Sequence, residues 1–491
     1  MYLLGIDIGT SSVKVSVIDA ETKVKVAAAQ FPEGEAPIQS PKPGWYEQHP
    51  EDWWSYTQKA IIKANATGKY NPKDIKGIGI SYQMHGLVLL NRHYHVLRPS
   101  IIWCDSRAVA IGENAFEALG KDYCRTHLLN SPGNFTASKL AWVQQNEPHI
   151  YRQIHAMMLP GDYVSFCLTG QATTSVSALS EGIFWDFKNN TLCNQLFEYY
   201  KLDTHYIPAI HPVFGTHGGV SPAVADELGL KAGTPVTYKC GDQPNNAFSL
   251  NVQQPGEIAA TAGTSGVLYG VTQHLSYDAE SRVNSFAHVN HTAEDPRIGI
   301  LLCINGTGNA YNWARRILGP QYSYNDMNFL SQSIPAGAHG LMFLPFGNGA
   351  ERMLNNTMPG AQLFGIDLNV HTPAHYFRAV QEGIAYSFRY GLDIMRENGL
   401  APTKMKAGRT NMFLSDTFCQ ALTHVTNLEL ELYDTEGSVG AAIAAGIGLG
   451  TFNAQNAFVG KQPVQTIKPG KLTQYEDFYQ QWKQRLLSYL P

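Results

Sequence analysis

Residues 3–17 read Leu-Leu-Gly-Ile-Asp-Ile-Gly-Thr-Ser-Ser-Val-Lys-Val-Ser-Val, and this stretch decides the fold that we expect. Its apolar beginning predicts a buried strand, and the alternation of valine with polar residues predicts a second strand. Between them, the Gly9-Thr10-Ser11 turn offers amides and hydroxyls that can bind an anion. Asp7 precedes the turn, where a carboxylate could hold a divalent cation against a phosphate. Taken alone, the stretch also fits an ordinary glycine hairpin.

A second copy of this turn lies 254 residues further along the chain, where residues 259–271 read Ala-Ala-Thr-Ala-Gly-Thr-Ser-Gly-Val-Leu-Tyr-Gly-Val. Gly263, Thr264 and Ser265 repeat the first turn, and valines match at two more positions. Two such turns predict related lobes that grip a polyphosphate from opposite sides. Because strands and helices alternate in both halves, we expect an α/β fold with two duplicated lobes around a central cleft.

Length and composition limit the class of protein. A chain of 491 residues is too long for one core, and we expect two domains, residues 1–246 and 247–491. The net charge of −4 gives no basic surface for nucleic acid or an anionic membrane. The seven cysteines are scattered without a Cys-x-x-Cys pair, and the first residues lack the pattern of a secretory signal. We therefore expect a cytoplasmic protein that binds neither nucleic acid nor membrane.

Two helices of the second half have clear sequence patterns. Thr372-Pro373 predicts the start of a helix that ends at Gly399 and carries one apolar stripe from Phe377 to Met395. Residues 437–450 are rich in glycine and alanine, which predicts a helix able to pack closely.

Polar residues at predicted strand ends suggest phosphoryl transfer to a polyol. Asp242 follows a predicted strand and is our candidate base for the attacking hydroxyl, although a turn aspartate is the alternative. Asp7 and Asp242 are the candidate magnesium carboxylates, acting through water. The candidate sugar contacts are side chains at strand ends of the first lobe: Met84, His85, Trp103 and Gln243.

The chain resembles the FGGY carbohydrate kinases along almost its whole length. The motifs that carry the resemblance include residues 5–14, Trp45 to Trp54, Gln83-Met84-His85-Gly86, residues 102–107, Gly241-Asp242, Gly263 to Gly266, residues 343–346, residues 378–386 and residues 437–442. Within the family, the Met-His-Gly triplet resembles the members that phosphorylate xylulose. The resemblance implies two ribonuclease-H-like lobes, as in actin and hexokinase, and Mg-ATP-dependent transfer to the 5-hydroxyl of D-xylulose.

Roles for single residues also follow from this resemblance. It implies that Asp242 accepts the proton, that Asp7 lies on the metal side, and that Met84 and His85 contact the sugar. The residues that the resemblance assigns to the nucleotide are Thr10, Thr264 and Gly308 at the phosphates and Gly408 at the adenosine; Ser11 and Gly263 join them from the two turns.

The chain departs from the family pattern at three places. Residues 407–411 read Ala-Gly-Arg-Thr-Asn where a glycine-rich adenosine loop is usual, Gln243 replaces an asparagine, and residues 349–353 hold one extra residue. Another ketose (ribulose, L-xylulose or a deoxyhexulose) therefore stays open as the substrate. An actin-like nucleotide switch without sugar kinase activity is the alternative from another class. The sequence gives no information on assembly, and a homodimer also stays open.

Overall fold

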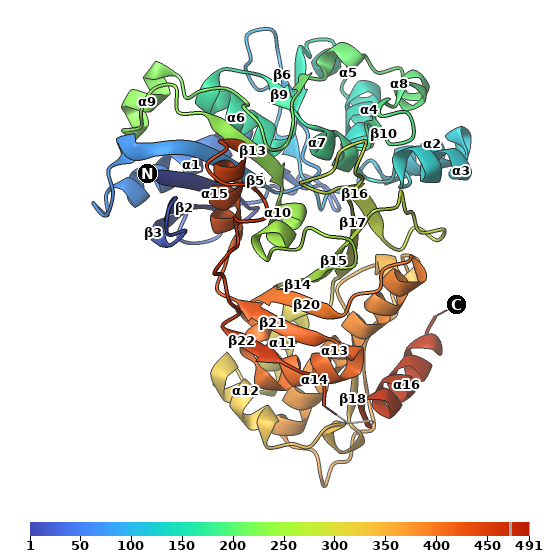
Figure 1. Ribbon diagram of the computed structural model, residues 1–491. Helices are drawn as coiled ribbons and strands as arrows, with labels where there is room; N and C mark the ends of the chain where they lie inside the picture. Colours follow the sequence, from blue (N-terminus) through green and yellow to red (C-terminus); the bar gives the residue numbers. More distant parts are fainter. Residues whose placement is uncertain (471–473, 491) are drawn as a thin grey trace.

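The computed structural model describes residues 1–470 and 474–490, and it contains two lobes that each surround a mixed β-sheet (Figure 1). The five strands of the first sheet pair in the order β13 (Val236–Gly241), β5 (Ile75–Tyr82), β1 (Tyr2–Ile8), β2 (Val13–Asp19) and β3 (Lys25–Phe31). The seven strands of the second sheet pair in the order β16 (Asn284–Ala287), β17 (Ile298–Ile304), β15 (Gly266–Thr272), β14 (Ile258–Ala262), β20 (Lys404–Gly408), β21 (Glu429–Tyr433) and β22 (Gln465–Ile467).

Both sheets share one topology. In the first, β1 pairs antiparallel with β2 and parallel with β5, and β2 pairs antiparallel with β3. In the second, β14 pairs antiparallel with β15 and parallel with β20, and β15 pairs antiparallel with β17. The prediction of two related α/β lobes is confirmed, and each Gly-Thr-Ser turn connects the first two strands of its sheet.

Helices cover both sheets. The first half contributes α1 (Pro50–Asn65), α2 (Val109–Leu119), α3 (Lys121–Tyr123), α4 (Thr136–Asn146), α5 (Pro148–Tyr151), α6 (Pro160–Thr169), α7 (Val176–Glu181), α8 (Asn194–Tyr200), α9 (Pro222–Leu228) and α10 (Asp242–Ser249). The second half contributes α11 (Gly308–Leu318), α12 (Tyr324–Gln332), α13 (Pro373–Glu397), α14 (Asp416–Thr426), α15 (Gly437–Gly448) and α16 (Gln474–Leu487). The predicted boundary between residues 246 and 247 falls inside α10 and stays a prediction.

Short strand pairs lie outside the two sheets. They are β4 (Glu47–Gln48) with β7 (Ser100–Ile101), β6 (Val88–Leu90) with β8 (Ala156–Met158), β9 (Thr173–Thr174) with β12 (Ala209–Ile210), β10 (Trp185–Asp186) with β11 (Thr191–Leu192), and β18 (Met342–Phe346) with β19 (Gly360–Phe364). Within residues 1–470 and 474–490, no helix combines the length and the apolar character that crossing a bilayer requires.

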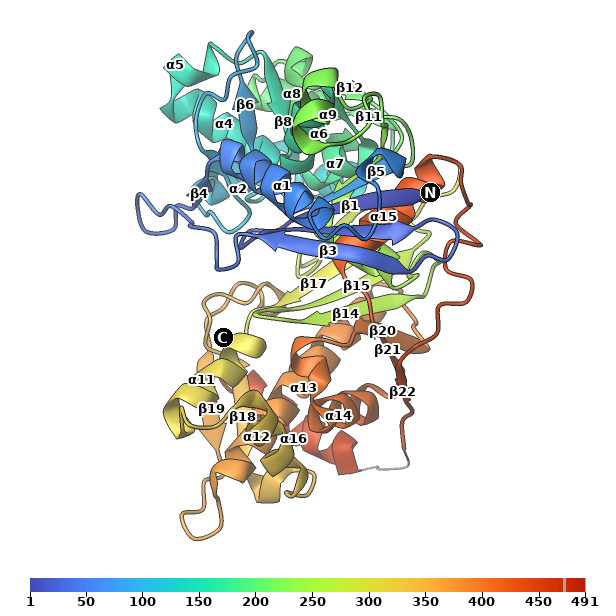
Figure 2. The same ribbon diagram turned by 90° about the vertical axis from the view of Figure 1, so that its left-hand side faces the viewer.

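Helix α15 comes from the second half of the chain but packs on the sheet of the first lobe, beside β1 and β5 (Figures 1 and 2). A Cβ on Gly5 of β1 would lie 1.8 Å from the carbonyl oxygen of Ser438, and one on Gly79 of β5 would lie 2.0 Å from that of Ala441. The helix can therefore touch the sheet backbone only because glycine occupies both positions. This contact ties the two lobes together on one side.

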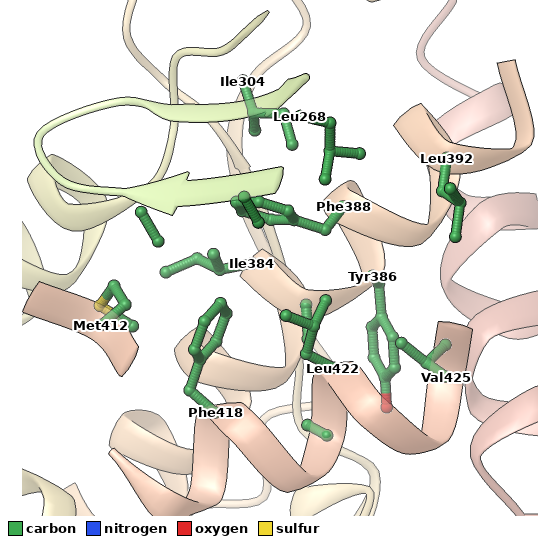
Figure 3. Close-up of a cluster of buried hydrophobic side chains, with 14 of the residues drawn as sticks. Leu268, Ile304, Ile384, Tyr386, Phe388, Leu392, Met412, Phe418, Leu422 and Val425 are labelled. Carbon is green, nitrogen blue, oxygen red and sulfur yellow. The ribbon is translucent and has the colours of Figure 1, made fainter. Parts of the chain in front are cut away.

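The core of the second lobe forms around α13. The predicted apolar stripe is buried, and Figure 3 shows Ile384 and Phe388 of this helix between Leu268 of β15 and Phe418 of α14. The rings of Phe388 and Phe418 meet edge to face with their centroids 6.0 Å apart. The predictions of this helix and of the small-residue helix that became α15 are both confirmed.

Candidate active site

The second Gly-Thr-Ser turn borders two cavities. One contains residues of both lobes, including Asp7 and Asn246 from the first and Gly263, Ser265 and Gly408 from the second. The other lies within the second lobe, and its lining residues are mainly amides and aromatic rings beside the same turn: Gly263, Thr264, Gly308, Asn309, Tyr311, Asn312, Tyr324, Asn325 and Asn328. Because Gly263 and Thr410 line both cavities, the two form one groove that leads from Asp7 into the second lobe.

This second turn is held against the beginning of α11. The backbone amides of Gly308 and Asn309 donate to the carbonyl oxygens of Gly263 (2.9 Å) and Thr264 (3.1 Å). A Cβ on Gly308 would lie 2.3 Å from the Gly263 oxygen, so no larger residue fits here. The turn and the beginning of α11 are therefore fixed against one another beside the groove.

The first turn has a different environment. Thr10 donates its hydroxyl hydrogen to Oε1 of Gln83 (3.1 Å), and its Oγ accepts a hydrogen bond from the indole of Trp103 (2.9 Å). Gln48 donates to the Thr10 carbonyl oxygen at 2.8 Å. Thr10 and Ser11 are not among the residues that line the interlobe cavity. The structure thus brings Thr10 next to candidate sugar residues rather than onto the groove.

Asp7 and Asp242 lie at the ends of β1 and β13, the two strands that flank β5. Ser81 of β5 is opposite Asp7 on one side and Cys240 of β13 on the other, and Asp242 follows two residues later as the first residue of α10. Both carboxylates are partly exposed. In the described residues, no group of three or more histidine, cysteine, aspartate or glutamate side chains could hold a metal.

Both carboxylates have raised pKa values. Desolvation raises the pKa of Asp242 to about 7, and the negative charge of Asp7 is the next largest cause. Desolvation also raises the pKa of Asp7, while a hydrogen bond from Ser81 opposes this. Gly437, the first residue of α15, leaves room for Asp7, because a Cβ there would lie 2.4 Å from Oδ2. Asp242 therefore has the pKa of a proton acceptor for chemistry near neutral pH.

The candidate sugar residues surround the loop after β5. His85 has a left-handed backbone (φ 63°), and its Nδ1 lies 2.9 Å from the carbonyl oxygen of Glu181. Desolvation, helped by the charge of Lys139, lowers the pKa of His85 to about 3. Since a carbonyl oxygen can only accept, Nδ1 carries the hydrogen of this neutral ring, and Nε2 is left as an acceptor.

The other predicted sugar residues differ in exposure. Met84 is buried, and a Cβ on Gly241 would lie 2.7 Å from its Cγ, so Met84 packs over the end of β13. Trp103 is 51% exposed and presents the rest of its indole to solvent. Gln243 follows Asp242 in α10 and hydrogen-bonds its carboxylate, which favours the ionised form.

Two buried side chains near His85 were not predicted. Glu181 is 2% exposed, with one carboxylate oxygen 3.7 Å from Nδ1 of His85, and desolvation raises its pKa well above the ordinary value. Lys139 is fully buried on α4. Arg352 reaches across from the second lobe, with its guanidinium 5.9 Å from the ring centre of Phe135, which itself packs against His85. The sequence signal for Lys139 and Glu181 was weak: each is a single charged residue within a largely uncharged segment.

Comparison with known proteins identifies the class. Residues 2–249 match the N-terminal domain of the FGGY family of carbohydrate kinases, and residues 258–449 match its C-terminal domain. This chain belongs to the FGGY family and is an ATP-dependent carbohydrate kinase, so the family that the sequence motifs indicated is confirmed.

Particular relatives are similar over most of their length. The xylulose kinase of Escherichia coli K12 is 30% identical over 91% of this chain and 88% of its own. The xylulose kinase of Brucella ovis is 26% identical, covers 99% of both chains and superposes with a TM-score of 0.89. A Plasmodium falciparum glycerol kinase, solved with ADP, also has a TM-score of 0.89 at 20% identity, which shows that the fold alone does not fix the sugar.

Proposed function

We propose that this kinase transfers the γ-phosphoryl group of ATP to the 5-hydroxyl of D-xylulose and releases D-xylulose 5-phosphate and ADP. The observation that carries the proposal is the environment of Asp242, whose pKa is raised to about 7. It follows Gly241, which packs against Met84, and its pKa responds to the charge of Asp7, a residue that lines the interlobe cavity. The similarity to xylulose kinases supports the choice of sugar.

Asp242 acts as the proton acceptor in this proposal. Its ionised carboxylate takes the hydrogen of the 5-hydroxyl as the oxygen forms its bond to the γ-phosphorus. The bond from that phosphorus to the bridging oxygen breaks, and ADP leaves with the electron pair. A general base in this position typically contributes about 10²–10⁴-fold to the rate. A pKa near 7 keeps the group ionised in much of the enzyme while it remains basic enough to accept the proton.

Asp7 and Asp242 are also the residues that fit Mg²⁺. Both carboxylates have raised pKa values, and the charge of Asp7 contributes to the shift of Asp242, so added positive charge between them would be favourable. Mg²⁺ prefers carboxylate oxygens together with water. When bound, Mg²⁺ would neutralise charge on the β- and γ-phosphates. Asp7 fits at this position because Gly437 at the beginning of α15 has no Cβ.

The sugar lies, in this proposal, between the first-lobe residues. Nε2 of His85 accepts a hydrogen bond from a sugar hydroxyl, since the neutral tautomer leaves it no hydrogen. Met84 supplies an apolar wall, and the exposed indole of Trp103 packs against the carbon chain of the open-chain ketose. Gln243 contacts the same substrate from α10.

The nucleotide occupies the groove beside the second turn. Gly263, Thr264 and Gly308 lie beside the phosphates, where Gly308 leaves room for the turn, and Gly408 lies against the adenosine. Thr10 and Ser11 remain in the proposal as first-lobe contacts to the γ-phosphate. Thr10 then exchanges its present hydrogen bonds when the lobes close on both substrates.

The alternatives differ in what they predict. A preference for another ketose would differ from this proposal only in the sugar contacts. Gln243, which replaces the asparagine usual in the family, is the residue that supports this alternative. A nucleotide switch needs no sugar residues at all, and membership of a carbohydrate kinase family argues against it. All seven cysteines are free thiols, which supports the cytoplasm as the location. A homodimer stays a prediction.

The substrate is tested by measuring ADP release with a panel of D-xylulose, D-ribulose, L-xylulose, L-ribulose and a deoxyhexulose. We expect the largest kcat/KM for D-xylulose. A larger kcat/KM for another ketose would replace the sugar while keeping the reaction, whereas ADP release that no sugar stimulates would contradict the proposed kinase activity.

A further inference from the structure

The ammonium group of Lys139 lies in the interior of the first lobe. The side chain is 0% exposed, and its helix α4 also contributes Ala137, Leu140 and Ala141 to a buried apolar cluster. Burying a charged amine is unfavourable unless it finds hydrogen-bond partners. Desolvation accordingly lowers the pKa of Lys139 to about 7, although the nearby negative charge of Asp105 opposes the shift.

The partners of Lys139 are two backbone carbonyl oxygens. Nζ donates to the carbonyl of His85 at 2.9 Å and to the carbonyl of Ile102 at 3.0 Å. His85 belongs to the loop after β5 that contains Met84, and Ile102 directly precedes Trp103. One ammonium group therefore joins both segments that carry the predicted sugar contacts.

Other hydrogen bonds also connect these two segments: Thr10 accepts from Trp103 and donates to Gln83, which precedes Met84. The amide of Leu87 donates to the carbonyl of Ile101 (3.1 Å), and this backbone bond connects the segments on one side of Lys139. His85 has a positive φ, a conformation that is unfavourable for a residue with a side chain and needs external contacts to persist. Its ring is fixed by Glu181, and its carbonyl is fixed by Lys139.

We propose that Lys139 is a positioning residue for the sugar: it holds the Met84–His85 loop and the Trp103 segment at a fixed separation so that both meet the same substrate. This inference rests on the proposed function, since it takes these residues as sugar contacts. Lys139 itself touches neither substrate. Its loss acts through the loops and so weakens sugar binding while leaving the nucleotide groove of the second lobe unchanged.

The test compares Lys139→Met with Lys121→Met, the same substitution at an exposed lysine of the same lobe. We expect Lys139→Met to raise KM for D-xylulose at least tenfold and to change KM for ATP less than twofold. We also expect faster amide hydrogen exchange in peptides spanning residues 83–87 and 101–105. Lys121→Met leaves all three quantities unchanged.

A second variant covers poor folding of the first. Lys139→Gln keeps an amide donor on a shorter side chain, and we expect a smaller rise in KM for D-xylulose in the same direction. An unchanged sugar KM in a folded variant, or an equal rise in both KM values, would overturn the proposal. Failure of both variants to fold would also overturn it, because Lys139 would then support the core rather than the loops.

The exchange measurement separates this inference from the proposed function. If the wild-type enzyme phosphorylates none of the ketoses, the proposed sugar fails. Faster exchange confined to the two segments in Lys139→Met would still establish that Lys139 holds them together, and exchange that rises throughout the first lobe would refute it.

Discussion

Replacing Asp242 by asparagine is expected to make the protein more stable and nearly inactive. The carboxyl of Asp242 ionises at 3.8 in its ordinary state, and the folded environment raises this pKa to about 7. The folded state therefore holds the proton more tightly than the unfolded chain. Ionisation weakens folding progressively as the pH rises through this interval, and the full cost is present above about pH 7.

The size of this cost follows from the pKa change. Raising a pKa from 3.8 to about 7 corresponds to roughly 4 kcal/mol. Because Asp242 is partly exposed, solvent screening reduces the usable value to about 2 kcal/mol. For a lobe of this size, that gain raises Tm by about 4–8 °C at pH 8. The increase shrinks as the pH is lowered toward 4, where the carboxyl is neutral in both states.

Thermal unfolding of the wild type and Asp242→Asn at pH 8 and pH 4 measures the effect. Asp105→Asn is the matched control, because that buried carboxylate pairs with Arg107 at 2.6 Å and its loss removes one of the two carboxylates, Asp105 and Glu47, that pair with this buried guanidinium. We expect the control to lower Tm at pH 8. If Asp242→Asn fails to raise Tm at pH 8, or raises it equally at both pH values, the conclusion that the ionised form of Asp242 destabilises the fold is refuted.

Three further outcomes follow from the same structure. The kcat/KM for D-xylulose should rise with pH, with a midpoint at about pH 7, as Asp242 ionises. Asp7→Asn removes the like charge and should lower this midpoint. An unchanged midpoint would contradict an effect of the Asp7 charge on Asp242. Gly5→Ala should destabilise the protein by about 3 kcal/mol, since its Cβ would meet the α15 backbone, whereas Gly34→Ala, with nothing within 4 Å, should leave the urea midpoint unchanged. His85→Ala should raise KM for the sugar about tenfold through loss of one acceptor and leave KM for ATP unchanged; equal changes in both would argue against a sugar contact.

Much of the fold could be predicted because its strands and helices have clear local sequence patterns. The strands of residues 3–17 and the repeated Gly-Thr-Ser turn predicted the first strands of both sheets and the duplication. The apolar stripe of α13 predicted a core helix. The location of α15 could not be predicted, because its glycine and alanine residues fit any close contact. Only the folded chain shows them against Gly5 and Gly79 of the other lobe.

The site was accessible to sequence reasoning to a smaller extent. Asp7 and Asp242 could be proposed from their positions at strand ends, and the structure does bring those strand ends together. Lys139 and Glu181 escaped notice, since a charge within an apolar segment gives no sign of which distant group it meets. The hydrogen bond between Thr10 and Trp103 likewise joins residues 93 positions apart and follows from the fold alone.

The central claim is that Asp242 takes the proton from a sugar alcohol while the groove beside the second turn holds the nucleotide. Its most direct test is the D-xylulose-dependent formation of sugar phosphate, followed by ³¹P NMR, in the wild type and in Asp242→Asn with both substrates saturating. The account predicts that the wild type forms D-xylulose 5-phosphate and that the variant binds ATP and D-xylulose but is slower by at least a factor of about 10². A variant that keeps more than a tenth of the wild-type rate would contradict the assignment of Asp242 as the proton acceptor.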